Sequence, residues 1–451
     1  MIFRPIVRAL GPLREHEQLL MISISTVLVM AGQGVISPIL PLFAKNLGVG
    51  AAVIGMTLSI FALARLILNV PLGILSDRYG RRALLVSGPL VTAAGMYGSG
   101  FAGDIYQLLA WRFLAGAGSA MYMTGAQIYL ADISTPATRA RFIGTNQGAL
   151  LLGVAIGPAI GGLVAEVWGL RAPFILVGTM ALVATAYAYL RLPETKHLSP
   201  PPPPKSEPAP GKKERRDWVV FMSSRDFLAV SFVTLAIFFT RTASRQTVIP
   251  LMAADDLGFS EGELGVLFTV VAGLNTILIA PSAVIADRWG RKAAIVPSGL
   301  FVAISLVVIG VSPSLLVFWA GNLALGVATA MAGPAPAAYA ADISPPHLRG
   351  LGMGLYRSSG DIGFMIGPVL LGAIADWTSY PFALGVNAAL MGVAALFFLT
   401  ARETVGRPAR HEPSPEASPE ASPEASHEAG PGVGGNTPTV AGRRGDRGGG
   451  D

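Results

Sequence analysis

The sequence predicts an all-α polytopic membrane protein with twelve transmembrane helices, arranged as two pseudo-symmetric six-helix bundles. Three observations predict this class. Of 451 residues, 52% are hydrophobic and only 13% are charged, whereas soluble domains carry roughly 25% charged residues. Long apolar segments recur along the whole chain. The second half also repeats the loop chemistry of the first half.

The apolar segments are long enough to cross the ~30 Å hydrocarbon core, which needs about 20 helical residues. In the first half we expect spans at residues 19–43, 52–74, 83–101, 105–133, 140–165 and 172–192. In the second half we expect them at residues 227–253, 262–285, 293–311, 314–341, 350–375 and 380–401. The first span is too long for a signal-peptide core and lacks a small-residue cleavage site, so we expect it to be retained.

The distribution of Lys and Arg predicts the orientation, because cytoplasmic loops carry the excess of these residues. With a cytoplasmic N-terminus, twenty of the 33 fall in the N-terminal segment, the cytoplasmic loops and the central linker, and six follow the last span. Only Lys45 and Arg171 lie outside, and the other five lie within spans. We therefore expect a multi-pass protein of the plasma (cytoplasmic) membrane with both termini in the cytoplasm.

Polar segments separate and flank the two halves. The linker contains five consecutive prolines, and a segment of this composition is an extended spacer rather than part of a core. The tail repeats the triplet SPE and is then rich in glycine, a composition typical of disorder. The expected organisation is a cytoplasmic N-terminus (1–18), a first bundle (19–192), a basic cytoplasmic linker (193–226), a second bundle (227–402) and a disordered cytoplasmic tail (403–451).

An internal repeat at an offset of 210 residues is the strongest signal of organisation. GILSDRYGRR at residues 73–82 returns as AVIADRWGRK at residues 283–292, and ADIS at 131–134 returns at 341–344. Such a duplication of six-helix units predicts a pseudo-twofold axis along the membrane normal.

The chain resembles the major facilitator superfamily, in particular its twelve-helix drug:proton antiporter group, over almost its whole length. GILSDRYGRR resembles the loop motif between helices 2 and 3 of that superfamily. WRFLAGAG at residues 111–118 is similar to its helix 4 motif, and GALLLGVAIGPAIGG at 148–162 to its helix 5 antiporter motif. VISPILP at 35–41 resembles the paired prolines of helix 1. The first motif indicates the superfamily, and none of them indicates a substrate.

Repeated charges at the ends of helices form a candidate gate. A carboxylate at a helix end can interact with the positive N-terminus of a neighbouring helix, an effect of about 0.3–1 kcal/mol. The resemblance implies that Asp77 faces the start of helix 11 and Asp287 the start of helix 5. We expect these contacts, with arginine–aspartate pairs, only when the cytoplasmic side is closed; the alternative is that the charges merely anchor the topology. The gating residues are Asp77, Arg78, Gly80, Arg81, Asp132, Asp287, Arg288, Gly290, Arg291 and Asp342.

A stripe of small residues on helix 5 is a candidate packing seam, because small residues let helices approach closely in lipid. The resemblance implies that the stripe lies between the two halves and restricts leakage at the periplasmic side. Helix 11 repeats the pattern. The residues of the stripe are Gly148, Gly153, Gly157, Pro158, Gly161 and Gly162.

Charges within spans are costly, at least ~2.5–3.5 kcal/mol each near the bilayer centre, and therefore need a reason. Asp361 is the one acidic residue well inside a predicted span. We expect it either to carry a coupling proton or to form a static pair with Arg357, one turn away. Arg112 matches the helix 4 motif, and the resemblance implies a part in proton transfer. Many drug exporters also place an acid in helix 1, where this chain has Gln33 and serines.

The candidate substrate cavity lies at the midplane between the halves, where transporters of this organisation bind their cargo. Five arginines (with Arg245) against one aspartate would give this cavity excess positive charge, which suits an anionic substrate. The expected cavity residues, besides Asp361 and Arg112, are Arg65, Gln147, Arg241, Asn275, Asn322 and Arg357.

The favoured function is secondary active export of small amphiphilic organic molecules or drugs, driven by the proton gradient through alternating access. The alternatives are an importer or uniporter of an organic anion, and a transporter-like sensor that carries no flux. We expect no enzymatic activity, no metal and no cofactor, because no metal cluster, catalytic triad or phosphate loop is present in the sequence and it contains no cysteine. The expected partners are a small-molecule substrate and the lipid bilayer, with no nucleic acid, and we expect a monomer.

Overall fold

The computed structural model describes residues 17–135, 138–198, 219–345 and 349–404. They belong to one compact unit, which spans Met1–Gly406. The expected tail after residue 404, most of the N-terminal segment and the centre of the linker lie outside the described residues.

The first bundle contains seven described α-helices, because its first span is broken in two. The break falls at Ser37–Pro38 in the VISPILP motif, where proline removes a backbone donor. The helices are α2 (Glu17–Ile36), α3 (Ile39–Lys45), α4 (Ala51–Tyr79), α5 (Arg81–Phe101), α6 (Ile105–Asp132), α7 (Arg139–Trp168) and α8 (Ala172–Arg191), and a short 3₁₀ turn, η1 (Lys196–Leu198), follows.

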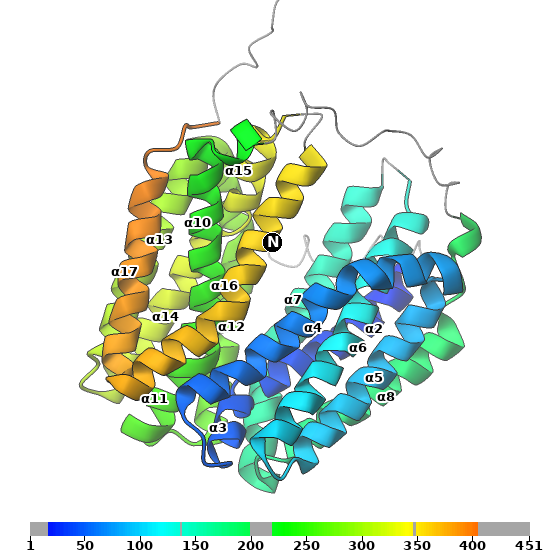
Figure 1. Cartoon of the computed structure of the whole chain (residues 1–451), viewed down its shortest axis with the longest axis horizontal. Helices are drawn as coiled ribbons and strands as arrows, with labels where there is room; N and C mark the ends of the chain where they lie inside the picture. Colours follow the sequence, from blue (N-terminus) through cyan, green and yellow to red (C-terminus); the bar gives the residue numbers. More distant parts are fainter. Residues whose placement is uncertain (1–16, 136–137, 199–218, 346–348, 405–451) are drawn as a thin grey trace, which may run out of the picture. The chain divides into compact units, whose positions relative to one another are not determined.

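The second bundle also contains a broken span. Here it is the fourth span, which is interrupted at Gly333, a residue with a positive φ of 42° that is followed by proline. The described elements are α10 (Arg225–Phe239), η2 (Thr240–Val248), α11 (Ile249–Asp256), α12 (Glu261–Trp289), α13 (Arg291–Gly310), α14 (Leu315–Ala332), α15 (Ala335–Ile343), α16 (Arg349–Trp377) and α17 (Tyr380–Phe398). Figure 1 shows the two bundles, with the first in blue to green and the second in green to orange.

The first span of the second bundle is not a regular α-helix. Its central element η2 is a π-helix, in which each turn is wider because hydrogen bonds join residues five apart. Arg241 and Arg245 are four residues apart, and they would share one face of a regular α-helix. In the π-helix their surroundings differ: Arg241 is exposed, whereas the Arg245 guanidinium lies 6.0 Å from the Phe268 ring centroid of α12.

Ten helical segments within the described residues are long and apolar enough to cross a membrane. The helices α5 and α6 are not among the ten but complete the first bundle, since α5 packs on both α6 and α8, and α6 packs on α4. Large apolar side chains on the outer faces, such as Ile74 (68% exposed) and Leu190 (76%), suit a lipid environment rather than water. The expected fold class is confirmed.

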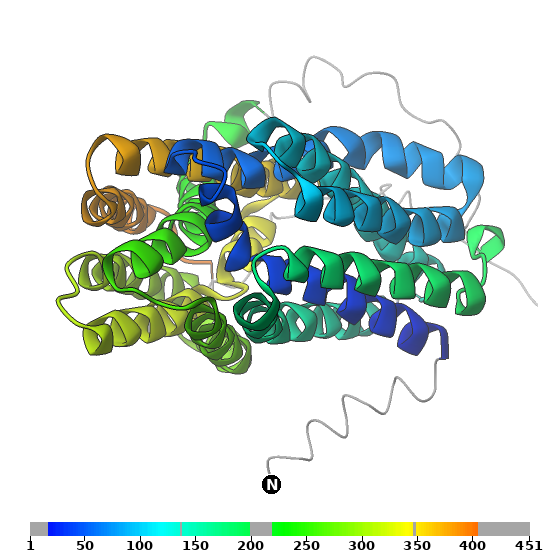
Figure 2. The ribbon, with the colours of Figure 1, turned by 90° about the horizontal axis from the view of Figure 1, so that it is seen from below.

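Two helix pairs join the bundles. The helix α4 packs on α16, and α7 packs on α12. We call the end around Gly80 and Gly290 the motif end, and the opposite end, around Ala51 and Glu261, the contact end. The short helices α3 and α11 also meet at the contact end (Figures 1 and 2).

Candidate functional site

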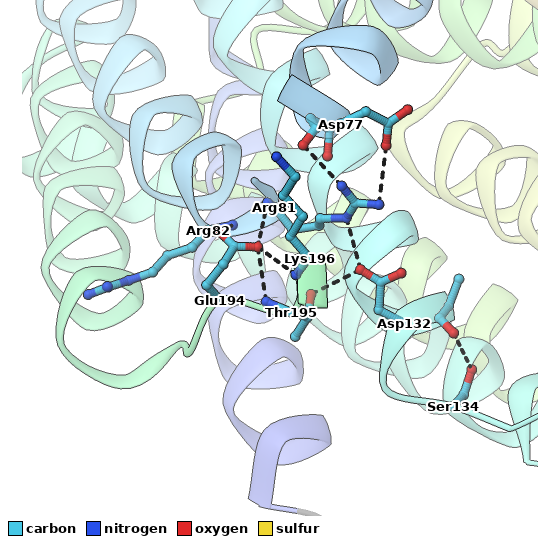
Figure 3. A network of polar contacts seen from close by, with 10 residues as sticks. Asp77, Arg81, Arg82, Asp132, Ser134, Glu194, Thr195 and Lys196 are labelled. Carbon is cyan, nitrogen blue, oxygen red and sulfur yellow. Dashed lines mark hydrogen bonds and ion pairs between the residues drawn. The ribbon is translucent and has the colours of Figure 1, made fainter. Parts of the chain in front are cut away.

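Arg81 is the centre of a polar network at the motif end of the first bundle (Figure 3). Its side chain is only 7% exposed, and its Nε donates to Asp132 Oδ2 over 2.9 Å. Its Nη2 lies 3.2 Å from Asp77 Oδ1, and its Nη1 donates to the carbonyl of Ser76 over 3.1 Å. The loop between α4 and α5 is thereby tied to the end of α6.

Glu194 is a member of this network to which the sequence analysis assigned no role. Its carboxylate accepts from the backbone N–H groups of Arg81 (2.9 Å) and Arg82 (3.1 Å), at the start of α5. It also accepts from the N–H groups of Thr195 and Lys196. Burial raises the pKa of Glu194, but these four backbone bonds outweigh burial and lower it below its ordinary value.

The second bundle repeats the network. Arg291 pairs with Asp287 (2.5 Å) and with Asp342 (3.3 Å). Glu403 accepts from the N–H groups of Arg291 (2.9 Å) and Lys292 (3.0 Å), as Glu194 does in the first bundle. PET at 193–195 and RET at 402–404 differ by one position from the 210-residue offset, yet their glutamates have the same partners.

The arginine–aspartate pairs form within each bundle, and this differs from the expectation. They were expected only when the motif end is closed. Arg81 nevertheless pairs with Asp132, and Arg291 with Asp342, while the side chains of Asp77 and Asp287 are 74% and 66% exposed. The reason is that Asp132 and Asp342 end helices of the same bundle as their arginines. Arg78 and Arg288 are also exposed. The starts of α7 and α16, the expected partners of the aspartates, adjoin residues outside the described ranges.

The glycine stripe of α7 divides between two neighbours. Gly153, Gly157 and Gly161 lie against the backbone of α2 in the same bundle. Only Gly162 and the carbonyl of Pro158 meet α12, across the interface. Gly148 has no close neighbour at its missing side chain. The expected position between the halves therefore applies to the last part of the stripe, because the turn of the helix points Gly153, Gly157 and Gly161 towards α2.

Three arginines and one carboxylate meet where α4, η2 and α16 face each other. Arg65 of the first bundle interacts electrostatically with Asp361, Arg357 and Arg241 of the second bundle. Arg241, Arg357 and Asp361 are exposed, although all lie within membrane-length segments. We call these four residues the arginine cluster.

The members of the arginine cluster are close but not directly paired. No ion pair within 4.0 Å joins Asp361 to Arg357 or to Arg65 in the part of the chain that the structure describes. The Nε of Arg65 is buried without a hydrogen-bond partner among those residues. The structure thus does not show the static Arg357–Asp361 pair, and the cluster keeps free donors and one free carboxylate.

Arg112 lies apart from the arginine cluster. It is 4% exposed on α6, and its guanidinium lies 4.8 Å from the Phe61 ring centroid. Its Nε donates to the carbonyl of Thr57 over 3.5 Å, and its Nη1 has no partner within the described residues. A cation held over an aromatic face at this depth gains about 2 kcal/mol or more, which helps to explain how the charge is tolerated.

The three expected amide residues do not converge. Gln147 is exposed on α7. Asn275 donates to Thr329 of α14 over 3.0 Å, within the second bundle. Asn322 is 2% exposed and donates to the carbonyl of Phe318 in its own helix. The side chains of Asn275 and Asn322 thus form hydrogen bonds within the second bundle, whereas the arginine cluster contains residues of both bundles.

A buried polar network in the first bundle was not predicted. Thr26 of α2 shares a hydrogen bond of 2.9 Å with Tyr122 and donates to Asn146 over 2.8 Å. It crosslinks α2, α6 and α7. Thr26 and Tyr122 have alanines at the repeat offset, so no repeat signal could have found it.

Comparisons with known proteins agree with this architecture. Residues 22–244 and 234–440 match the family described as Major Facilitator Superfamily. An uncharacterized MFS-type transporter of Methanocaldococcus jannaschii is 26% identical over 80% of this chain and 92% of its own. Multidrug resistance protein 1 of Bacillus subtilis is 25% identical over 80% of this chain and 91% of its own.

A solved structure has the same fold. The crystal structure of a bacterial homolog to the human lysosomal transporter Spinster, in an inward-facing and occupied conformation, superposes with a TM-score of 0.68 at 16% identity. The match covers 86% of this chain and 95% of that one. From the two-bundle fold, the repeated motif-end networks and the family match, this chain belongs to the Major Facilitator Superfamily of membrane transporters.

Proposed function

We propose that the protein is a secondary active transporter that exports small amphiphilic organic molecules across the plasma membrane, coupled to the proton gradient. The arginine cluster carries this proposal. One carboxylate and three guanidinium groups interact at the interface between the bundles, and we assign proton exchange to the carboxylate and cargo binding to the guanidinium groups. The resemblance to a multidrug resistance protein supports export of drug-like molecules.

The proposed orientation places the motif end in the cytoplasm. Short basic loops at that end follow the positive-inside distribution. Contacts at the contact end then close the path to the outside, and the arginine cluster is reached from the cytoplasm. Alternating access requires a second conformation with the opposite ends open and closed.

Proton movement during transport tests the coupling directly. Purified protein is reconstituted into liposomes that hold an internal pH dye and a pH gradient, and a panel of amphiphilic compounds is added. We expect compounds that are transported to dissipate the gradient, and protein-free liposomes to show no such signal. Compound accumulation that is unchanged by an uncoupler would contradict proton antiport.

A second candidate, import of an organic anion, is favoured by the net charge of the arginine cluster. Three guanidinium groups face a single carboxylate, and guanidinium groups bind carboxylate and sulfonate oxygens through planar pairs of donors. An anion would compete with the Asp361 carboxylate for these arginines. A proton on Asp361 therefore favours anion binding, so that anion and proton would move in the same direction.

Three probes that share the naphthalene ring system and differ in charge separate the two candidates: naphthalene-2-sulfonate, naphthalene-2-sulfonamide and 2-naphthyltrimethylammonium. Export of neutral or cationic amphiphiles predicts proton movement opposite to the sulfonamide or the ammonium compound. Anion import predicts transport of the sulfonate alone, in the same direction as protons.

A further inference from the structure

The N-terminus of α4 lacks a cap of its own. Its N-cap residue is Gly50, and no side chain of the same bundle caps it. The first four N–H groups of an α-helix have no partner within the helix. Asp376 of α16, in the other bundle, supplies one: its two carboxylate oxygens accept from Ala51 N over 2.7 Å and from Ala52 N over 2.9 Å.

Glycines around this contact allow the carboxylate and the two helices to approach closely. A Cβ at Gly50 would lie 2.7 Å from Asp376 Oδ2, so only a glycine leaves room for the carboxylate. Close backbone contacts then follow the two helices inward, from Gly372 against Ala51 to Pro368 against Gly55. The helices α4 and α16 are therefore antiparallel neighbours, and the cap closes the end of their seam.

The equivalent residue in the repeat is Glu166, 210 positions earlier. It lies against Gly262 near the start of α12, but no hydrogen bond joins it to α12 among the described residues. The reason is that α12 caps itself: Ser260 and Glu263 form a capping box, with bonds of 3.2 and 2.9 Å. Of these two helices, α4 alone depends on a cap from the opposite bundle.

The same antiparallel pair has a carboxylate at its other end. Asp77 lies near the C-terminal end of α4, which is the end of the pair where α16 begins, and it is exposed in this conformation. We infer that Asp376 is a positioning residue for alternating access: it holds the contact end shut by capping α4 across the interface, and it releases this cap when the motif end closes.

Distances between spin labels at the motif end and at the contact end test this role, and the measurement needs no substrate. The chain has no cysteine, so introduced cysteines are the only labelled sites. Tyr79 and Trp289 report on the motif end, and Tyr106 and Leu316 on the contact end; all four are at least 60% exposed. Removing a helix cap costs about 0.5–2 kcal/mol. Asp376→Ala should therefore shift the ratio of the two conformations about two- to thirtyfold, shortening the motif-end distance and lengthening the contact-end distance.

Two further variants make the result decisive. Glu166→Ala is the matched control, and we expect it to leave the ratio unchanged, because α12 keeps its own capping box. Gly50→Ser gives α4 a cap of its own and displaces the Asp376 carboxylate, so it should shift the ratio in the same direction as Asp376→Ala while α4 stays capped. Unchanged distances in Asp376→Ala and Gly50→Ser, or an equal shift in Glu166→Ala, would overturn the inference.

Discussion

At the residue scale, the arginine–aspartate pairs of the repeated motifs were predictable, and contacts to backbone groups were not. The 210-residue offset identified Arg81, Asp132 and their second copies, and the structure brings each pair together. Glu194 and its counterpart were not assigned a role, because accepting backbone N–H groups leaves no mark in the spacing of charges. Arg65 and Asp361 were expected in one cavity, and Arg65 does interact electrostatically with Asp361. Which of the other expected cavity residues would join them depends on how helices from opposite bundles face each other.

Asp361→Asn tests the residue that we propose to carry the coupling proton. Asparagine keeps the shape of the side chain but cannot take up and release a proton. We expect gradient-driven accumulation to be lost while exchange of substrate between the two sides of the membrane continues. Active accumulation equal to that of the unmodified protein would eliminate Asp361 as the proton carrier.

Gly80→Ala should destabilise the motif-end network. Gly80 has a φ of +93°, which L-residues rarely adopt, and an added Cβ would collide with the Glu194 carboxylate. Strain of this kind costs about 1–3 kcal/mol, so the melting temperature in detergent should fall. Gly73→Ala, which meets nothing within 4 Å, is the control and should melt close to the unmodified protein. Equal melting of the two variants would contradict the assigned geometry.

The lowered pKa of Glu194 predicts the acid response of the same network. A carboxylate whose folded-state pKa lies below its unfolded value stabilises the fold above the unfolded pKa, and this stabilisation is lost as the pH falls through the folded pKa. Between neutral pH and about pH 5, above the ordinary value of about 4.3 for Glu, the stability difference between the unmodified protein and Glu194→Gln should be constant. It should shrink at lower pH. A difference that already shrinks near neutral pH would show that Glu194 is not held ionised by its backbone bonds.

At the scale of elements, the spans were predictable from the length of the apolar segments. Only some of the interruptions within the spans have a signal in the sequence. The break after Ile36 follows from proline, whereas the π-helix at Thr240–Val248 has no signal in apolar periodicity. The glycine stripe of α7 was predictable as a seam, but its division between α2 and α12 depends on the rotation of the helix.

Substitutions along this stripe should have three different effects. Gly157→Val places its side chain against the backbone of α2. It should lower the melting temperature by several degrees, because overpacking typically costs about 1–3 kcal/mol. Gly162→Val meets α12 instead, so it should mainly lengthen the contact-end distance between labels at Tyr106 and Leu316.

Gly148→Val is the control for this series, because nothing lies within 4 Å of its missing side chain. We expect it to change neither the melting temperature nor the label distance. A change in Gly148→Val as large as in Gly157→Val would show that the stripe has a different orientation in the membrane.

At the scale of the whole molecule, the duplication predicted two bundles, but not the conformation in which they meet. That conformation depends on which end of α4 and α16 is held together, and the chain carries carboxylates at both ends. The cap at the contact end and the exposure of Asp77 at the motif end together define the conformation that the structure shows. The central claim is that the bundles exchange this arrangement for one with the opposite end closed.

The most direct test measures both label pairs, at residues 79 and 289 and at residues 106 and 316, in the otherwise unmodified protein in lipid nanodiscs. We predict two distances for each pair, with populations that change in opposite senses at the two ends when the pH or an amphiphilic compound is varied. A single distance for each pair under all conditions, or distances that lengthen together at both ends, would contradict alternating access between the bundles.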